Sequence, residues 1–143
     1  MTGFIVFDLD GTLANCTHRL HHIQQEPKNW DAFYAACALD APIEPVIRLF
    51  RSLRDVRVDI WTGRSAEVER KTRAWLTAHR LFPWYLRMRG ARDYRQDDVL
   101  KAEWLDSLPS DERPTLVFED RKRVVDMWRS RGIQCCQVAT GEF

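Results

Sequence analysis

The chain has 143 residues, and its hydrophobic content of 45%, with six Trp and seven Phe, is enough for one buried core. Its 22 Lys and Arg nearly balance its 21 Asp and Glu, which excludes the strong positive charge of proteins that bind nucleic acid or membranes nonspecifically. The N-terminal apolar run is too short for a signal peptide, and no run approaches the roughly 18 residues of a membrane span. We therefore expect one cytoplasmic domain over residues 1–143, with no membrane partner.

Short apolar segments bounded by turn residues alternate with helical patterns along the chain. The segments typical of buried strands span residues 3–9, 56–61, 115–119 and 133–139. Apolar residues at helical spacing lie between or beside them at residues 43–53, 68–79, 99–108 and 124–128. This alternation predicts an α/β fold of the Rossmann-like, three-layer α/β/α kind, with a central parallel sheet. A ligand is then expected at the carboxyl ends of the strands.

Residues 13–42 do not follow this alternation. We interpret them as a small helical cap inserted after the first strand, with a helix near Trp30 to Cys37, lying over the site. Its aromatic and imidazole side chains either stack on a nucleotide or pack within the cap, and both interpretations stay open. These side chains are His18, His21, His22, Trp30, Phe33 and Tyr34.

Polar residues follow several of the predicted strands. Asp8 and Asp10 come after the first strand, residues 62–64 (Thr-Gly-Arg) after the second, and Glu119 and Asp120 end the strand at residues 115–119. In a parallel sheet these groups meet at one edge, where the carboxylates would repel one another unless a divalent cation lay between them. A hard, oxygen-ligated ion such as Mg²⁺ is the expected cofactor.

Three other residues suit a phosphate group. Thr62 offers a hydroxyl, Gly63 allows the backbone to approach closely, and Lys101 offers a point charge from the start of a helix. With a cation on one side and Lys101 on the other, the negative charge of a phosphate would be neutralised.

These residues also carry a family resemblance. Asp8 to Thr12 (DLDGT), residues 62–64 (TGR), Lys101 and Glu119 to Arg121 (EDR) resemble the four motifs of the haloacid dehalogenase superfamily, in order. The C-terminal part, RGARDYRQDDVLKAEW and FEDRKRVVDMWRSRGIQCCQVATGEF, resembles the 3′-phosphatase domain of bacteriophage polynucleotide kinase/phosphatase. The chain departs from that family at Glu119, where the family usually has Asp.

The resemblance implies a role for each motif residue. Asp8 would be the nucleophile that forms an aspartyl-phosphate, and Asp10 the general acid and base. Mg²⁺ would be held by Asp8, by the backbone carbonyl of Asp10 and by Asp120, while Glu119 orients bound water. The other phosphoryl oxygens would be bound by Thr62, the Gly63 amide and Lys101.

Three arginines, Arg64, Arg89 and Arg121, are candidates for contacting the phosphate or sugar of a substrate, because guanidinium groups bind oxyanions in a bidentate manner. Arg89 also matches a position that the phage phosphatase family uses. For Arg64, a salt bridge to Asp97 or Asp98 is an equally open interpretation.

Together these features predict a Mg²⁺-dependent phosphomonoesterase that removes 3′-phosphate from polynucleotide ends. One alternative is a nucleoside monophosphate phosphatase acting on 5′- or 3′-nucleotides, and another is a non-catalytic phosphate-binding or receiver-like module. The sequence has no GxxxxGK[ST] phosphate-binding loop. A cooperating kinase or ligase on a separate chain stays an open expectation. Nothing in the sequence indicates an oligomeric state.

Overall fold

The computed structural model describes residues 3–141 and contains a five-stranded, entirely parallel sheet. The strand order is β5-β4-β1-β6-β7, so β1 lies at the centre. The strands are β1 (Ile5–Phe7), β4 (Val58–Ser65), β5 (Leu86–Arg89), β6 (Leu116–Glu119) and β7 (Gln134–Gln137).

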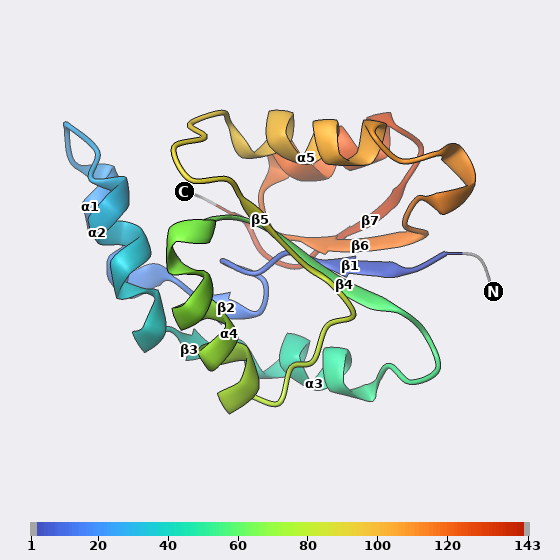
Figure 1. Ribbon diagram of the computed structural model, residues 1–143, viewed down its shortest axis with the longest axis horizontal. Coiled ribbons are helices and arrows are strands. Elements are labelled where there is room, and N and C mark those ends of the chain that lie inside the picture. Colours follow the sequence, from blue (N-terminus) through green and yellow to red (C-terminus); the bar gives the residue numbers. More distant parts are fainter. Residues whose placement is uncertain (1–2, 142–143) are drawn as a thin grey trace.

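Two helices cover each face of the sheet, which gives the three layers predicted from the sequence (Figure 1). Helices α3 (Glu44–Ser52) and α4 (Glu69–Ala78) lie on one face, and α5 (Asp97–Asp106) and α6 (Lys122–Ser130) on the other. Consecutive side chains of β1 point to opposite faces of the sheet. Val6 packs in the core under α5 and α6, and Phe7 packs in the core under α3 and α4. The predicted fold class is therefore confirmed.

The predicted strands and helices are present with small changes of boundary. The second strand is longer than predicted, because β4 continues through Thr62, Gly63 and Arg64 to Ser65 and includes an irregularity where it pairs with β5. Residues 62–64 therefore belong to the strand itself instead of following it. The sheet holds them in place at its carboxyl edge.

The sequence pattern does not predict β5. Its four residues, LRMR, alternate apolar and charged side chains. Two apolar residues are too few to indicate a strand at the edge of the sheet. The charged member Arg87 places its guanidinium 5.4 Å from the centre of the Trp61 ring and 5.2 Å from that of Trp104. The guanidinium group of Arg87 is thus within cation–π range of two aromatic core residues.

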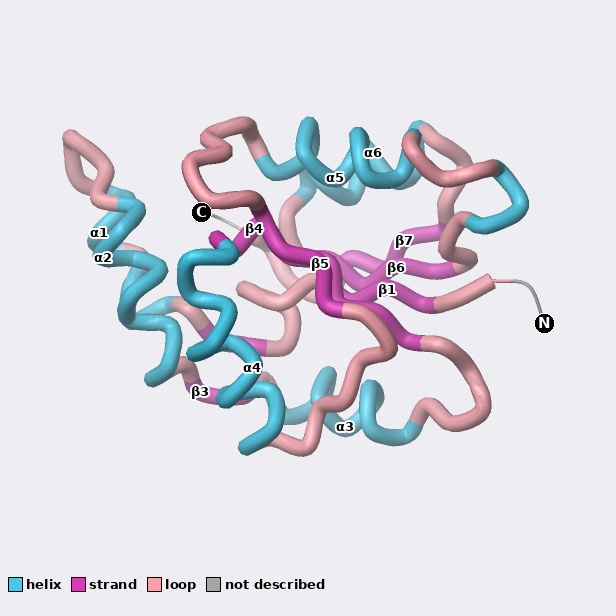
Figure 2. The backbone as a smooth tube through the Cα atoms, in the orientation of Figure 1, coloured by secondary structure: helices cyan, strands magenta, loops and turns pink. Residues whose placement is uncertain are grey.

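Residues 13–42, the predicted cap, form a separate small layer beyond the carboxyl ends of the strands (Figure 2). The short antiparallel pair β2 (Ala14–Asn15) and β3 (Ala41–Pro42) joins the two ends of this inserted segment. Between them lie α1 (His21–Gln24), α2 (Trp30–Ala35) and two 3₁₀ turns at Thr17–Arg19 and Ala36–Leu39. The predicted helix from Trp30 to Cys37 is thus an α-helix that tightens into a 3₁₀ turn.

None of the helices within residues 3–141 is long and apolar enough to cross a membrane.

Trp128 is completely buried in the core under α6, where its ring centre lies 5.7 Å from that of Trp61. We expect Trp128→Ala to lower the free energy of unfolding by about 3 kcal/mol or more, because it leaves a large cavity. Urea denaturation measures this change. Trp84→Ala is the matched control, since Trp84 is 76% exposed, and an equal loss in both variants would contradict the assigned core.

Candidate active site

The adjacent parallel strands β1 and β6 bring three carboxylates together. Phe7 pairs with Phe118, so Asp8 and Glu119 follow at the same level, with Asp120 one residue further. All three are buried, and one ligand atom from each lies within 4.8 Å of the others. The convergence predicted from the strand ends is present in the structure.

Lys101 of α5 supplies the positive charge at this cluster. Its Nζ donates to Asp8 Oδ1 at 2.7 Å and to Glu119 Oε2 at 2.9 Å, and lies 3.4 Å from Asp97 Oδ2. Burial lowers the pKa of Lys101, but the carboxylates of Asp8, Asp97 and Glu119 raise it by more, so the ammonium group stays charged. One cation therefore faces three carboxylates, with Asp120 beside them.

The remaining negative charge fits a divalent cation. Both carboxylate oxygens of Asp120 are buried, and neither accepts a hydrogen bond from residues 3–141. Burial and the neighbouring Asp8 carboxylate raise the pKa of Asp120 to about 8. Both oxygens of Glu119 are already engaged, one by Lys101 and the other by the Asp120 amide. Asp120 thus offers two oxygen atoms without a hydrogen bond from residues 3–141, and Asp8 Oδ2 accepts only a long hydrogen bond of 3.4 Å from the Thr12 hydroxyl. These oxygen atoms suit Mg²⁺, while Glu119 holds Lys101 and the start of the next loop.

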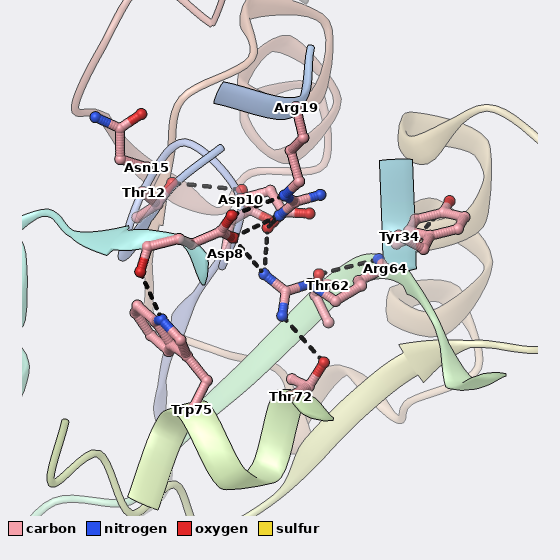
Figure 3. A network of polar contacts seen from close by, with 12 residues as sticks. Asp8, Asp10, Thr12, Asn15, Arg19, Tyr34, Thr62, Arg64, Thr72 and Trp75 are labelled. Carbon is pink, nitrogen blue, oxygen red and sulfur yellow. Dashed lines mark hydrogen bonds and ion pairs between the residues drawn. The ribbon is translucent and has the colours of Figure 1, made fainter. Parts of the chain in front are cut away.

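Asp10 lies in a second, charge-balanced cluster with the inserted segment (Figure 3). Asp10 Oδ1 accepts from Arg19 Nη2 at 2.7 Å and from Arg64 Nη2 at 2.5 Å. The same two guanidinium groups donate to Asp40 Oδ2, at 2.6 Å and 3.2 Å. Burial raises the pKa of Asp10, but Arg64 and Arg19 together lower it to about 2. Asp10 is therefore a carboxylate at neutral pH.

The position of Arg64 corrects one interpretation of the sequence. Arg64 forms no salt bridge with Asp97 or Asp98; its guanidinium donates to Thr72 at 3.0 Å and to the Asp10 and Asp40 carboxylates. The reason is that Arg64 is buried below the inserted segment, on the Asp10 side of the site. The structure thus places Arg64 against an acidic site residue.

Thr62 and Gly63 border a small cavity of about 50 Å³ together with Asp8, Asp10 and Asp120. The Thr62 hydroxyl accepts a hydrogen bond from the Arg64 amide at 3.0 Å, which leaves its own proton available for an oxyanion in the cavity. At Gly63 a Cβ atom would lie 2.0 Å from Asp97 Oδ1, so only glycine allows α5 to approach this closely. The cavity is therefore bounded by the carboxyl groups of Asp8, Asp10 and Asp120 and by a hydroxyl donor.

Arg89 holds backbone in place. It donates to the carbonyl oxygens of Gly63 at 2.6 Å, Asp93 at 3.1 Å and Arg95 at 2.5 Å. Tyr34 of α2 donates to the same Gly63 carbonyl at 3.3 Å. The Gly63 peptide is thus fixed both by Tyr34 of the inserted segment and by Arg89 of β5. Both side chains line the small cavity.

Arg121 also lines this cavity, at the residue that precedes α6. Among the side chains of the inserted segment, Phe33 packs into a local core with Cys16 and Ile23, and Trp30 and Tyr34 pack against this core. All three aromatic side chains also border the small cavity. His21 and His22 lie against each other with ring centres 4.0 Å apart. Packing thus accounts for Phe33, which is 2% exposed, while the more exposed Trp30 and Tyr34 are placed to contact a ligand.

The sequence patterns do not single out Arg19, Asp40 and Asp97 as site residues. Arg19 and Asp40 lie in the irregular inserted segment, where no spacing rule connects residues 21 positions apart. Asp97 could have been found, because it precedes Lys101 by one helical turn and so shares its face of α5.

The fold and the site together define a class of protein. The structure matches a haloacid dehalogenase-like hydrolase from Streptococcus pneumoniae with a TM-score of 0.66 and 14% identity, over 95% of this chain and 84% of that chain. It matches L-2-haloacid dehalogenase from Xanthobacter autotrophicus with a TM-score of 0.60 and 13% identity, over 96% and 78%. The fold is therefore that of the haloacid dehalogenase superfamily.

The family within this class is also defined. The model of the polynucleotide kinase PNKP phosphatase domain matches residues 2–143, and the chain belongs to this family of phosphatases. A chain in the structure of the Pnkp1/Rnl/Hen1 RNA repair complex is similar, with 26% identity and a TM-score of 0.82. All of this chain is covered, but only 44% of that one, so the present chain spans less than half the length of its relative.

The raised pKa of Asp120 predicts how stability depends on pH and metal. Its pKa is about 8 in the folded chain against an ordinary 3.8, so the folded state holds a proton that the unfolded state has lost in this range. With a chelator present, the free energy of unfolding should therefore fall as pH rises from about 4 to about 8. Mg²⁺ should stabilise the protein, most strongly at the upper end.

Urea titrations with chelator and with Mg²⁺ at several pH values measure both effects. Asp120→Asn removes this ionisation and should weaken the dependence on pH and on Mg²⁺. Part of the pH dependence should remain, because burial raises the pKa of Asp8 to about 8 and that of Glu119 to about 7. Stability that is independent of pH in chelator would contradict the assigned burial of an unpaired carboxyl group.

Asp40 pairs with two buried guanidinium groups, so Asp40→Asn should lower the free energy of unfolding by about 3 kcal/mol. Asp106→Asn removes a half-exposed pair with Arg131 and should cost less than about 1 kcal/mol. Chemical denaturation compares the two variants. Similar losses would show that the cluster of Asp10, Arg19, Asp40 and Arg64 does not hold the inserted segment.

Proposed function

We propose that the chain is a Mg²⁺-dependent phosphomonoesterase that removes 3′-phosphate from polynucleotide ends through an aspartyl-phosphate on Asp8. The observation that supports it most strongly is the arrangement around the small cavity. Asp8, the Thr62 hydroxyl and Asp120, with its two oxygens lacking partners, surround a space for one phosphoryl group. Membership of the PNKP phosphatase family supports a nucleic-acid end as the substrate.

In the first step an Asp8 carboxylate oxygen attacks phosphorus, and the P–O bond to the substrate alcohol breaks. Lys101 holds Asp8 Oδ1 at 2.7 Å, which fixes the carboxylate and stabilises its ionised form. Mg²⁺ bound by Asp8, Asp120 and the Asp10 carbonyl would neutralise phosphate charge. The Thr62 hydroxyl and the Gly63 amide would bind the phosphoryl oxygens.

Asp10 would transfer the protons. The leaving alkoxide takes a proton from Asp10, and in the second step Asp10 takes a proton from the water that attacks phosphorus and releases Asp8. The low pKa of Asp10 suits the second step directly, because its carboxylate is ionised and ready to accept. The negative charge of an arriving phosphate raises the pKa of a nearby carboxyl group, which favours the protonated form needed in the first.

The similar chain in the RNA repair complex also bears on substrate and partners. This similarity favours RNA ends as substrates alongside DNA ends. It also favours a kinase or ligase activity that acts on the same termini, located on the same chain or on a separate one.

A labelled oligonucleotide with a 3′-phosphate should release inorganic phosphate only when Mg²⁺ is present, and Asp8→Asn should abolish release, because the amide cannot attack phosphorus. Asp126→Asn, an exposed aspartate paired with Lys122, is the matched control and should retain full activity. The same assay measures kcat/KM for 5′-phosphorylated oligonucleotides and for 3′- and 5′-mononucleotides, and these values are compared with that for the 3′-phosphorylated oligonucleotide. Faster turnover of mononucleotides than of polymer ends would favour a nucleotidase instead.

A further inference from the structure

A larger groove adjoins the small cavity of the candidate active site. Its volume is about 680 Å³, within the range of ligand sites. One wall is the inserted segment from Ile23 to Tyr34, and the other is the loop of residues 92–97 before α5. Trp30, Tyr34 and Arg121 line both the groove and the small cavity, so the two are continuous. A substrate whose phosphate is at Asp8 would therefore extend into the groove.

The groove offers aromatic rings and unpaired cations. Tyr94 is 83% exposed on one wall, and Trp30 is half-buried on the other. Within residues 3–141, Arg92 and Arg123 are exposed and form no ion pair, and Lys28 places its ammonium group 5.9 Å from the centre of the Trp30 ring. Rings that stack on bases, together with cations that neutralise phosphodiesters, are what single-stranded nucleic acid requires.

The loop that carries Tyr94 is fixed before any ligand arrives. Arg89 donates to the backbone carbonyls of Asp93 and Arg95, the residues on either side of Tyr94. The Arg95 side chain in turn pairs with Asp93 and with Glu103 of α5. An exposed aromatic side chain on a braced loop loses little conformational entropy on binding, which favours a contact surface.

We propose that this groove binds the nucleotides next to the phosphorylated 3′ end of a single strand, with Tyr94 stacking on a base and Arg92 contacting a phosphodiester. The inference rests on the proposed function and adds the polymer-binding residues to it. A single strand is required because a base inside a duplex does not expose its face to Tyr94.

The test compares substrates of increasing length. For the wild type, kcat/KM should rise from a 3′-mononucleotide through a dinucleotide to a hexanucleotide, with p-nitrophenyl phosphate as the substrate that cannot reach the groove. Tyr94→Ala should lower the ratio of kcat/KM for the hexanucleotide to that for p-nitrophenyl phosphate by roughly 10-fold. The matched control is Tyr85→Ala, because Tyr85 is 51% exposed and lies outside both cavities.

Arg80 is the matched control for Arg92. Arg92 and Arg80 are both exposed and both have a positive φ, 62° and 57°. Arg92→Ala should lower the same ratio and weaken its dependence on salt, whereas Arg80→Ala should leave both as in the wild type. Ratios unchanged in Tyr94→Ala and Arg92→Ala, or no increase of kcat/KM with length, would overturn the groove assignment while the phosphatase assignment stands.

A binding experiment separates this inference from the proposed function. The Asp8→Asn variant and the double variant Asp8→Asn/Tyr94→Ala are each titrated with a fluorescent single-stranded hexanucleotide. Fluorescence anisotropy gives the two dissociation constants. Weaker binding on loss of Tyr94 supports the groove even if the wild type releases no 3′-phosphate, which would contradict the proposed reaction alone. Equal binding by the two proteins, or tighter binding of a blunt duplex than of a single strand, would overturn the groove assignment.

Discussion

A single buried ammonium group, that of Lys101, pairs with the carboxylates of Asp8, Asp97 and Glu119, and the rest of the site depends on it. Charges are costly to bury unless they are paired, so the groups that surround Lys101 must be held at hydrogen-bonding distance. The parallel register of β1 and β6 provides two of them, and the glycine at position 63 lets α5 bring the third. The sheet and α5 are thus arranged around one charge.

Asp10 is kept apart from this cluster, although it lies only two residues from Asp8. Its carboxylate belongs to a group of two aspartates and two arginines whose charges cancel. The Lys101 cluster keeps an excess of negative charge, which a metal ion can satisfy, while the Asp10 cluster does not need one. Two carboxylates of one short motif therefore have different electrostatic surroundings. Burial and the neighbouring Glu119 raise the pKa of Asp8 to about 8, which a bound cation would lower, whereas the two arginines hold the pKa of Asp10 at about 2.

The sequence is sufficient to predict the parallel sheet, because apolar strands and amphipathic helices alternate with clear turn signals. It also predicts that Asp8, Thr62, Lys101 and Asp120 come together, since each lies near the end of a strand or in the first half of a helix and within a recognisable motif. It does not predict β5, whose charged residues mask its alternation, or the pairing of Arg19 with Asp40. That pairing depends on how an irregular segment folds back onto the sheet, and no local periodicity encodes it. The role of Arg89 is also not predicted by residue type alone. An arginine suggests a ligand for an oxyanion, but the buried Arg89 donates to three backbone carbonyls.

The inserted segment is joined to the sheet by buried contacts at its far end. The Trp75 indole of α4 donates to the Asp40 carbonyl at 2.8 Å, and the Asp40 carboxylate binds Arg64 of β4. A segment held in this way is a fixed wall, so a polymer end of the kind proposed above would reach Asp8 along the open groove without waiting for a conformational opening. Its association rate would then follow diffusion and ionic strength, with electrostatic attraction to the exposed arginines as the main accelerating factor.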